Sequence, residues 1–369
     1  MLNKIVGLLI LTLYLLVFFV ALEQGPLVST QSFILGVLGL IVILLIVSSI
    51  AMKIRLVDIS DEPRKQHIGK IPLVGGIGIY VSLVYGAFVF GVSNFYFYVL
   101  ASLIPIMIVG IIDGIHGVNV KPVYRIIAQI LSSWIIILTT DIYLKDLGNI
   151  LGIGTLYIGQ LGIPFTIFAV VGICNAFNMI DGKDGLLGSI TVIIICSLLW
   201  LLYVNNEIYQ WGQILVFSIL VYLAFNLGLF GKKRKIFLGD HGSTALGHII
   251  AWSLIDLSQE SKIITSVSAL WFVLLPLTDC LLTFARRTKS SASILVADRL
   301  HFHHKLSDMG YSDNKILLLF CLITIVSCAI ALASNIFGID ESIMFYAFIT
   351  LLAVLSLLGF INPTKDNKD

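Results

Sequence analysis

The chain has 369 residues, of which 58% are hydrophobic and only 12% are charged. Soluble domains usually carry about 25% charged residues, so this composition excludes a soluble globular protein and predicts an all-α protein that has the bilayer as its solvent. The formal net charge of +2 implies no attraction of the whole molecule to nucleic acid.

Apolar segments of about 20 residues, the length that crosses a bilayer as a helix, recur along the chain. The segments near 163–177 and 244–256 are short for a complete crossing. The pattern predicts a polytopic membrane helical bundle of about 11 to 12 transmembrane helices. Their approximate limits are 5–22, 33–52, 73–91, 96–112, 123–140, 163–177, 187–204, 211–230, 244–256, 264–284, 315–335 and 342–361.

The first of these segments follows Lys4 and could be mistaken for a signal peptide. It has no clear small-x-small cleavage site and is long enough to span, so we expect residues 1–30 to hold an extra signal-anchor helix. Residues 31–362 are then expected to form one membrane-embedded core, and residues 363–369 a short cytoplasmic tail.

Basic residues are distributed very unevenly between the two predicted faces. With alternating helices, 21 of the 23 basic residues fall on the face that holds both termini, and only Lys145 and Lys262 fall on the other. The positive-inside rule makes the basic face cytoplasmic. Six of the seven histidines lie on this face as well, so we expect the chemistry there: His67, His116, His241, His301, His303 and His304.

Residues 175–186, NAFNMIDGKDGL, carry polar side chains at every third position: Asn175, Asn178, Asp181 and Asp184. This spacing puts them on one side of a helical turn. Carboxylates at a membrane boundary are costly unless they are paired or bind metal. A polar helix cap with solvated aspartates is the alternative interpretation.

Residues 232–243, KKRKIFLGDHGS, place Phe237 and Asp240 after four basic residues and before an apolar segment. A helix that begins here would offer free N–H groups to an anion. A plain N-cap explains the same pattern, and the basic run would equally suit anionic lipid headgroups.

Residues 286–306 end in a His-x-His-His cluster, His301, His303 and His304, after Arg299. A zinc site would need cysteine or carboxylate partners at regular spacing, which this loop lacks. Three histidines near Arg287 and Arg299 favour an anion site, with simple solvation as the alternative.

Together these loops offer carboxylates for Mg²⁺, which prefers oxygen ligands and substrate phosphates, and cations for the remaining phosphate charge. Such groups serve phosphoryl transfer by positioning and electrostatic stabilisation. The sequence has no GxxxxGK[ST] motif, which excludes a P-loop ATPase.

Five motifs resemble the polyprenyl-phosphate N-acetylhexosamine-1-phosphate transferase family, of the MraY-like superfamily, and occur in family order. They are RKQHIGKIPLVGG, NAFNMIDGKDGLLG, FLGDHGST, PLTD and DRLHFHH. The resemblance is strongest to the bacterial branch that makes undecaprenyl-diphosphate-GlcNAc from UDP-GlcNAc. It implies a multi-pass enzyme of the bacterial cytoplasmic (inner) membrane whose active site faces the cytoplasm. It also implies the first membrane step of a surface glycan such as O-antigen lipopolysaccharide or a cell-wall polymer.

The resemblance also implies roles for individual residues. Asp240 is expected to bind Mg²⁺, or Mn²⁺ as an alternative, with Asn178 as a second metal ligand. Asp184 and Phe237 are expected at the uracil, and Asp181 in the same catalytic motif. Further substrate contacts are expected from Lys65, His67, Lys70, Lys121, Asn175, Arg287 and Arg299, and His301, His303 and His304 are expected to line the nucleotide-sugar site.

One position departs from the family pattern, which has adjacent aspartates where this chain has Asp113 and Gly114. If Asp113 alone carries the role, activity survives; if the second carboxylate is essential, the protein is an altered or inactive relative. Other readings are a different UDP-amino sugar as donor, or a transporter with a cytoplasmic anion site. The expected partners are the UDP-sugar, undecaprenyl phosphate and the bilayer, with a homodimer also compatible and nucleic acid excluded.

Overall fold

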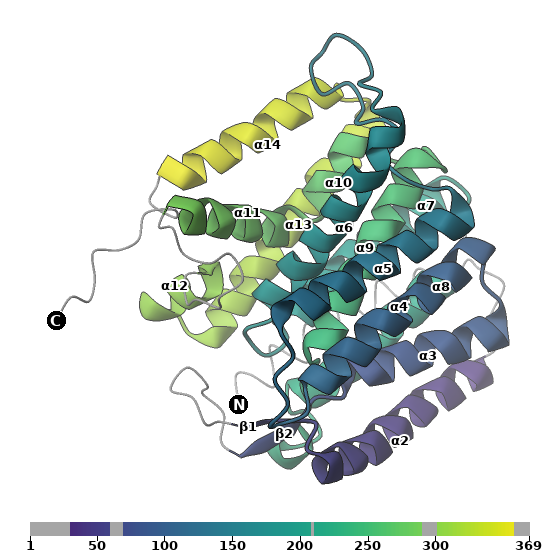
Figure 1. Cartoon of the computed structure of the whole chain (residues 1–369), viewed down its shortest axis with the longest axis vertical. Helices are drawn as coiled ribbons and strands as arrows, with labels where there is room; N and C mark the ends of the chain where they lie inside the picture. The colour runs from purple at the N-terminus through teal and green to yellow at the C-terminus, as the bar shows by residue number, and fades with distance from the viewer. Residues whose placement is uncertain (1–29, 60–68, 208–209, 290–300, 358–369) are drawn as a thin grey trace.

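The computed structural model describes residues 30–59, 69–207, 210–289 and 301–357. In these ranges the chain is a bundle of α-helices with one small sheet (Figure 1). The elements are α2 (Thr30–Ile54), β1 (Val57–Ile59), β2 (Lys70–Pro72), α3 (Gly75–Phe90), α4 (Asn94–Asp113), α5 (Pro122–Thr140), η1 (Gly159–Leu161), α6 (Gly162–Ile180), α7 (Leu186–Val204), α8 (Gln210–Asn226), η2 (Lys232–Arg234), α9 (Asp240–Gln259), α10 (Ser266–Phe272), α11 (Leu274–Lys289), α12 (Phe302–Asp308), α13 (Asp313–Phe337) and α14 (Glu341–Leu355).

The predicted helical membrane fold is confirmed. Six described helices are long and apolar enough to cross a bilayer, and a seventh crossing results if the bent pair α10 and α11 counts as one span. Helices α3, α8 and α14 are shorter but apolar. Each predicted segment from 33–52 onward coincides with helix, whereas the predicted first helix and the 363–369 tail lie outside the described residues.

The tenth predicted segment, 264–284, is not one continuous span. It forms α10 and α11, which meet at Val273 with a bend of 87°. Pro276 explains the position of the break, because a proline ring clashes with the carbonyl of the residue four positions earlier. That residue is Phe272, the last residue of α10. Helix α11 therefore lies across the bundle (Figure 1).

Helix α9 lies at the centre of the bundle. Its 20 residues correspond to about 30 Å of helix, so the predicted short segment 244–256 has the length of a full crossing. Every residue from His241 to Ser258 is buried, because α9 packs against α3, α4, α6, α7 and α10. The outer helices instead expose large apolar side chains such as Phe88 and Leu138, as lipid-facing surfaces do.

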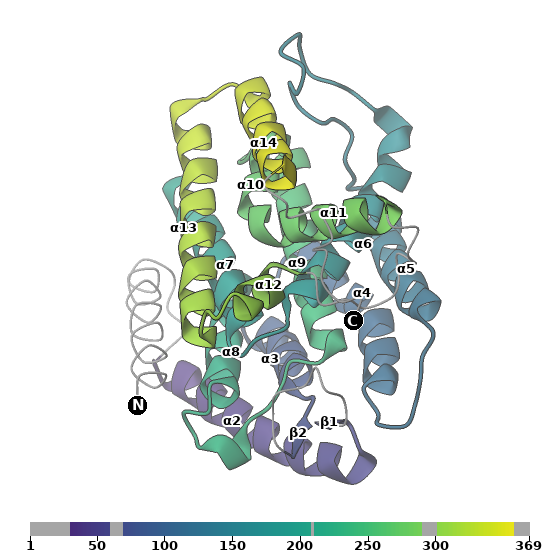
Figure 2. The same ribbon diagram turned by 90° about the vertical axis from the view of Figure 1, so that its left-hand side faces the viewer.

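The connections gather at two opposite ends of the bundle. In both views the β1–β2 sheet lies at one end, and the loop between α5 and α6 protrudes at the other (Figure 2). The sheet was not predicted; its antiparallel strands pair Val57 with Pro72. Leu73, directly after β2, forms a parallel bridge with Phe237 and so ties the sheet to the segment that leads into α9.

Candidate active site

The polar loops converge on one cavity of about 1440 Å³. They come from the ends of α4, α6 and α11, the starts of α5 and α9, and α12, so residues almost 200 positions apart face the same space. Most of the predicted site residues line it: Asp113, Asn175, Asn178, Asp181, Asp184, Phe237, Asp240, Arg287, His301, His303 and His304.

Five predicted substrate contacts are not found on this cavity wall. Lys70 and Lys121 are exposed and do not line the cavity. Lys65, His67 and Arg299 lie outside the described residues. The roles implied for these five side chains stay predictions.

Glycines set the position of Asp240 at the first turn of α9. The segment before it is held by backbone hydrogen bonds, from Gly75 N to Phe237 O and from Gly76 N to Leu238 O. Gly76 and Gly242 allow α3 and α9 to touch, because a Cβ on Gly242 would lie 2.7 Å from the Gly76 Cα. Because neither Gly76 nor Gly242 has a side chain, the two segments can pack in direct backbone contact.

Arg125 links the two carboxylates nearest the start of α9. Its Nη1 lies 2.7 Å from Asp240 Oδ2 and 3.4 Å from Asp113 Oδ2. Asp113 also accepts a hydrogen bond from Val120 N at 3.2 Å. Arg125 was not among the site residues predicted from the sequence. The available signal was its position four residues after Lys121, one turn further into α5 and closer to the cavity.

The end of α6 supplies a polar row whose members find partners on neighbouring helices. Asn175 Nδ2 donates to Gln129 Oε1 of α5 at 2.8 Å. Asn178 Nδ2 donates to Ser243 Oγ of α9 at 2.9 Å, which leaves the Asn178 carbonyl oxygen available to a ligand. All four members of the row line the same cavity, but α6 ends at Ile180, so Asp181 and Asp184 lie beyond the helix and not on its face. Gln129 is a further cavity residue that was not predicted.

Asp181 follows α6 directly and is the most perturbed carboxyl group of the site. Burial raises its pKa to about 7, and the negative charges of Asp240 and Asp184 add to this effect. A cation placed between these carboxylates would reverse the shift, because opposite charge favours ionisation.

Asp184 pairs with Lys235 from the basic run before α9. The Lys235 ammonium also lies 5.1 Å from the centre of the Phe237 ring. The two residues predicted at the uracil, Asp184 and Phe237, therefore lie together on the cavity wall with Lys235, which was not predicted there. An aromatic face and a carboxylate are suited to stacking on and hydrogen bonding to a planar base.

The histidine cluster is built on α11 and α12. Asp279, in the PLTD motif, accepts from His301 Nδ1 at 2.9 Å and from Phe302 N at 2.9 Å, which fixes the start of α12. His303 is 1% exposed and lines the cavity, and neither of its ring nitrogens has a hydrogen-bond partner among the described residues. A Cβ on Gly182 would overlap His303 Nε2, so this glycine makes room for the ring.

His303 is neutral near pH 7. Burial, followed by the nearby His304 and His301, lowers its pKa far below the ordinary value. A buried imidazole with two unpaired nitrogens has one donor and one acceptor to offer. It is therefore equipped for a polar ligand that enters the cavity.

The carboxylates fit a hard cation that shares its coordination with a ligand. Within the described ranges no three His, Cys, Asp or Glu side chains form a ready metal cage. Mg²⁺ does not need one, because it is usually held by one or two carboxylates with phosphates and water. Arg125, between Asp113 and Asp240, places a positive charge where such a cation would be stabilised.

The cavity continues from these polar groups into an apolar arm between α6, α9, α10 and α11. We use the name apolar arm for the part lined by Phe168, Leu254, Leu270, Leu277 and Phe284. Cationic side chains, among them Arg125 and Arg287, line the same cavity. The arrangement suits a ligand with phosphate groups at one end and a long apolar portion at the other.

Comparison with known proteins gives a consistent result. The profile of glycosyl transferase family 4 matches residues 96–258. Among similar proteins, that of Escherichia coli O157:H7 is 33% identical over 85% of this chain and 83% of its own length. The protein of Yersinia pestis is 34% identical over 86% of each chain. That of Haemophilus influenzae is 35% identical over 85% of this chain and 89% of its own length. All three are named undecaprenyl-phosphate alpha-N-acetylglucosaminyl 1-phosphate transferase, and the resemblance based on the motifs is confirmed.

Proposed function

The chain belongs to glycosyl transferase family 4, and from this membership we propose that it transfers GlcNAc-1-phosphate from UDP-GlcNAc to undecaprenyl phosphate. The products are undecaprenyl-diphosphate-GlcNAc and UMP. The observation that supports this most is the single cavity in which phosphate-binding cations and carboxylates adjoin an apolar arm. We further propose that the protein is a multi-pass enzyme of the bacterial cytoplasmic membrane, where it begins a surface glycan.

The reaction is a direct displacement at phosphorus. An oxygen of the lipid phosphate attacks the phosphorus that carries the sugar, and the bond from this phosphorus to the bridging oxygen breaks. UMP leaves with that oxygen and its electron pair. The lipid phosphate is largely ionised near neutral pH, since its second pKa is about 6, so Asp113 is not required as a strong base.

The protein groups act by orientation and charge. Asp184 and Phe237 hold the uracil, with Lys235 neutralising the carboxylate between substrates. Arg125 and Arg287 pair with the phosphates, and His303 donates one ring N–H to the nucleotide sugar. Because these side chains already line the cavity, their charges and dipoles can stabilise the charge that develops in the transition state.

Mg²⁺, or Mn²⁺, is proposed to be held by Asp240 and the carbonyl oxygen of Asn178. Its bound charge offsets the negative charge that builds on the diphosphate. Without a cation the pKa of Asp181 is about 7. A bound cation would lower this pKa, so that the ionised Asp181 carboxylate would add negative charge to the metal site.

The test is UMP release by purified protein with UDP-GlcNAc and undecaprenyl phosphate. We expect release that requires the lipid, stops with a chelator, and falls at least about 100-fold in Asp240→Asn, a loss of about 2.7 kcal/mol of transition-state stabilisation. Asp141→Asn, an exposed carboxylate at the opposite end of α5, is the matched control and should retain full activity. Lipid-independent release, or an unaffected Asp240→Asn, contradicts the proposal. A screen of other UDP-amino sugars then defines the donor.

A further inference from the structure

The cavity extends far beyond the reacting groups. Its wall includes Asp240 at the start of α9 and Ser258 near its end, 18 residues later. At 1.5 Å per residue this is about 27 Å, close to the hydrocarbon thickness of about 30 Å. The cavity, with the apolar arm as its inner part, therefore extends through nearly the whole thickness of the membrane.

A hairpin closes the far end of the arm. Residues 144–158 fold back on themselves, with Leu147 N donating to Leu156 O and Leu156 N donating to Gly148 O. Three apolar side chains of this hairpin line the cavity: Leu144, Leu147 and Ile150. The tip faces outward, since Ile153 is 87% exposed and does not line the cavity. One segment thus has a cavity-facing side and a free side.

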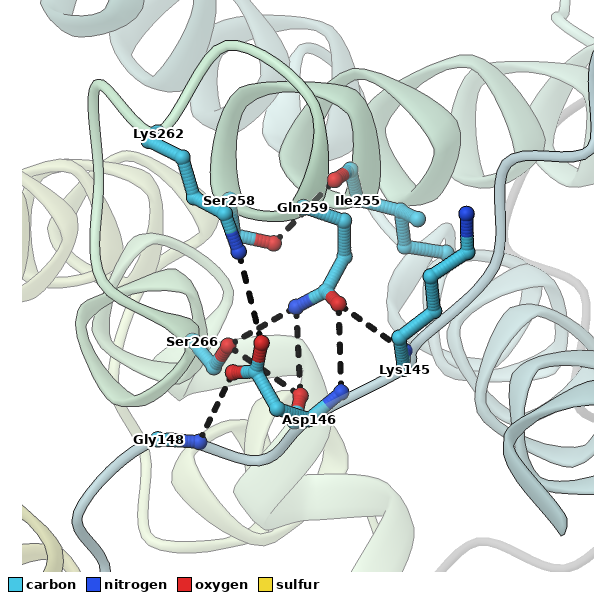
Figure 3. Close-up of polar contacts among 8 residues, drawn as sticks. All are labelled: Lys145, Asp146, Gly148, Ile255, Ser258, Gln259, Lys262 and Ser266. Carbon is cyan, nitrogen blue, oxygen red and sulfur yellow. Dashed lines mark hydrogen bonds and ion pairs between the residues drawn. The ribbon is translucent and has the colours of Figure 1, made fainter. Parts of the chain in front are cut away.

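Gln259, the last residue of α9, holds the hairpin in place (Figure 3). Its Oε1 accepts from the backbone N–H groups of Lys145 at 2.9 Å and Asp146 at 3.3 Å. Its Nε2 donates to Asp146 O at 3.1 Å and to Ser266 Oγ of α10 at 3.0 Å. The carboxamide thereby uses both donors and both acceptor sites, and it joins the hairpin to α9 and α10.

The Asp146 carboxylate adds a second attachment. Its Oδ1 accepts from Gly148 N at 3.2 Å, and its Oδ2 lies 3.3 Å from Lys262 Nζ (Figure 3). Leu144 N is tied to Thr166 Oγ1 of α6 at 2.8 Å. The hairpin is thus connected to three elements of the apolar arm, α6, α9 and α10, through hydrogen bonds that only a fixed hairpin position satisfies.

We propose that this hairpin forms the floor of the lipid-tail site, and that Gln259 is a positioning residue by which the enzyme selects acceptor lipids of sufficient tail length. The inference rests on the proposed function. A long polyprenyl tail fills the arm down to Leu147 and Ile150, whereas a short tail ends before the hairpin. The tail is already surrounded by hydrocarbon in the bilayer, so the gain on reaching the hairpin comes from closer packing contacts with these side chains.

The experiment measures kcat and KM for farnesyl, heptaprenyl and undecaprenyl phosphate, together with binding of each lipid in the absence of UDP-sugar. Gln259→Met removes the four hydrogen bonds at nearly constant volume. Leu147→Trp fills the floor of the arm. Ile153→Trp adds the same bulk on the free side of the hairpin and is the matched control.

We expect KM of the unaltered protein to fall as the tail lengthens. Gln259→Met and Leu147→Trp should raise KM for undecaprenyl phosphate about tenfold, a loss of about 1.4 kcal/mol of packing contacts. Their kcat, and their KM for farnesyl phosphate and UDP-GlcNAc, should stay unchanged because the reacting groups lie at the other end of α9. Retained activity with farnesyl phosphate also shows that the variants fold.

Two results would overturn the inference: KM ratios that are the same for all three lipids, or an equal effect of Ile153→Trp. Length-dependent binding without UMP release would contradict the proposed reaction while supporting the hairpin's role. UMP release that does not depend on tail length would support the proposed reaction and contradict the hairpin's role. A protein that neither binds these lipids nor releases UMP contradicts both.

Discussion

Gly114 stands where the family resemblance implies a second aspartate, and the side chains nearest to it are those of Leu56 and Leu73. A Cβ there would lie 2.8 Å from Leu56 Cδ1 and 3.3 Å from Leu73 Cδ1. Leu56 is itself 1% exposed. A second carboxylate at this position would enter a leucine-lined corner, while Asp113 alone reaches Arg125.

Gly114→Asp should therefore destabilise the protein without raising its activity. The steric overlap with Leu56 forces side chains out of their positions, which costs about 1–3 kcal/mol. Thermal unfolding and UMP release are the measurements. Gly114→Ala separates the two effects, because it keeps the overlap and lacks the charge. An aspartate variant more active than the natural protein would show that the missing carboxylate matters.

The raised pKa of Asp181 predicts that the free energy of unfolding depends on pH. Its pKa is about 7 in the folded protein, against an ordinary value of 3.8 for an aspartate, so folding favours the protonated form. This contribution to the free energy of unfolding is complete below pH 3.8 and is lost as the pH rises through 7, with an upper limit of about 4 kcal/mol. Melting of the metal-free protein at pH 5 and pH 8 tests this. Asp181→Asn should reduce the difference, and an unchanged difference would assign it to other groups.

At the scale of elements, the contact between α3 and α9 fixes the site. Gly76→Ala would overlap the Gly242 Cα, a backbone atom that cannot move aside without shifting α9 and Asp240. We expect a loss of activity of about 100-fold together with a lower melting temperature. Gly78→Ala, two residues further along α3, meets only the flexible end of Leu44 and should be much milder. Equal effects of the two substitutions would show that the contact has no special role.

The helices could be predicted from the sequence because bilayer thickness fixes their length, so an apolar run near 20 residues is a sufficient signal. The break at Val273 was missed because Pro276 sits inside such a run, and hydropathy does not register backbone geometry. The strands β1 and β2 have three residues each, too few for an alternating pattern.

The candidate site was partly predictable for a related reason. Placing polar side chains at a membrane boundary costs free energy, so the presence of Asp181 and Asp240 there indicates a functional site. Arg125 and Gln129 became recognisable only through partners more than 40 positions away, Asp240 and Asn175. Asp279 was visible within its motif, but its contact with the histidine cluster requires the bend between α10 and α11.

For the whole molecule, the two ends of the bundle should face different compartments. Lys232 and Lys262 lie at opposite ends and are both exposed. Lys262→Cys should react with a membrane-impermeant maleimide on intact spheroplasts, and Lys232→Cys only after permeabilisation. The background should be low, since four of the five native cysteines are buried and the fifth is partly buried. Labelling of both variants from the same side would contradict the proposed orientation.

The complete enclosure of α9 has a consequence for how the protein is made. This helix carries His248 and Asp256 among its buried residues, and it is less apolar than its neighbours. Lipid cannot satisfy such groups, so α9 gains a suitable environment only where α3, α4, α6 and α7 already stand. All four precede it in the chain. Synthesis from the N-terminus thus delivers the partners before the helix that depends on them, and the order of the segments along the gene matches the order in which the bilayer can accept them.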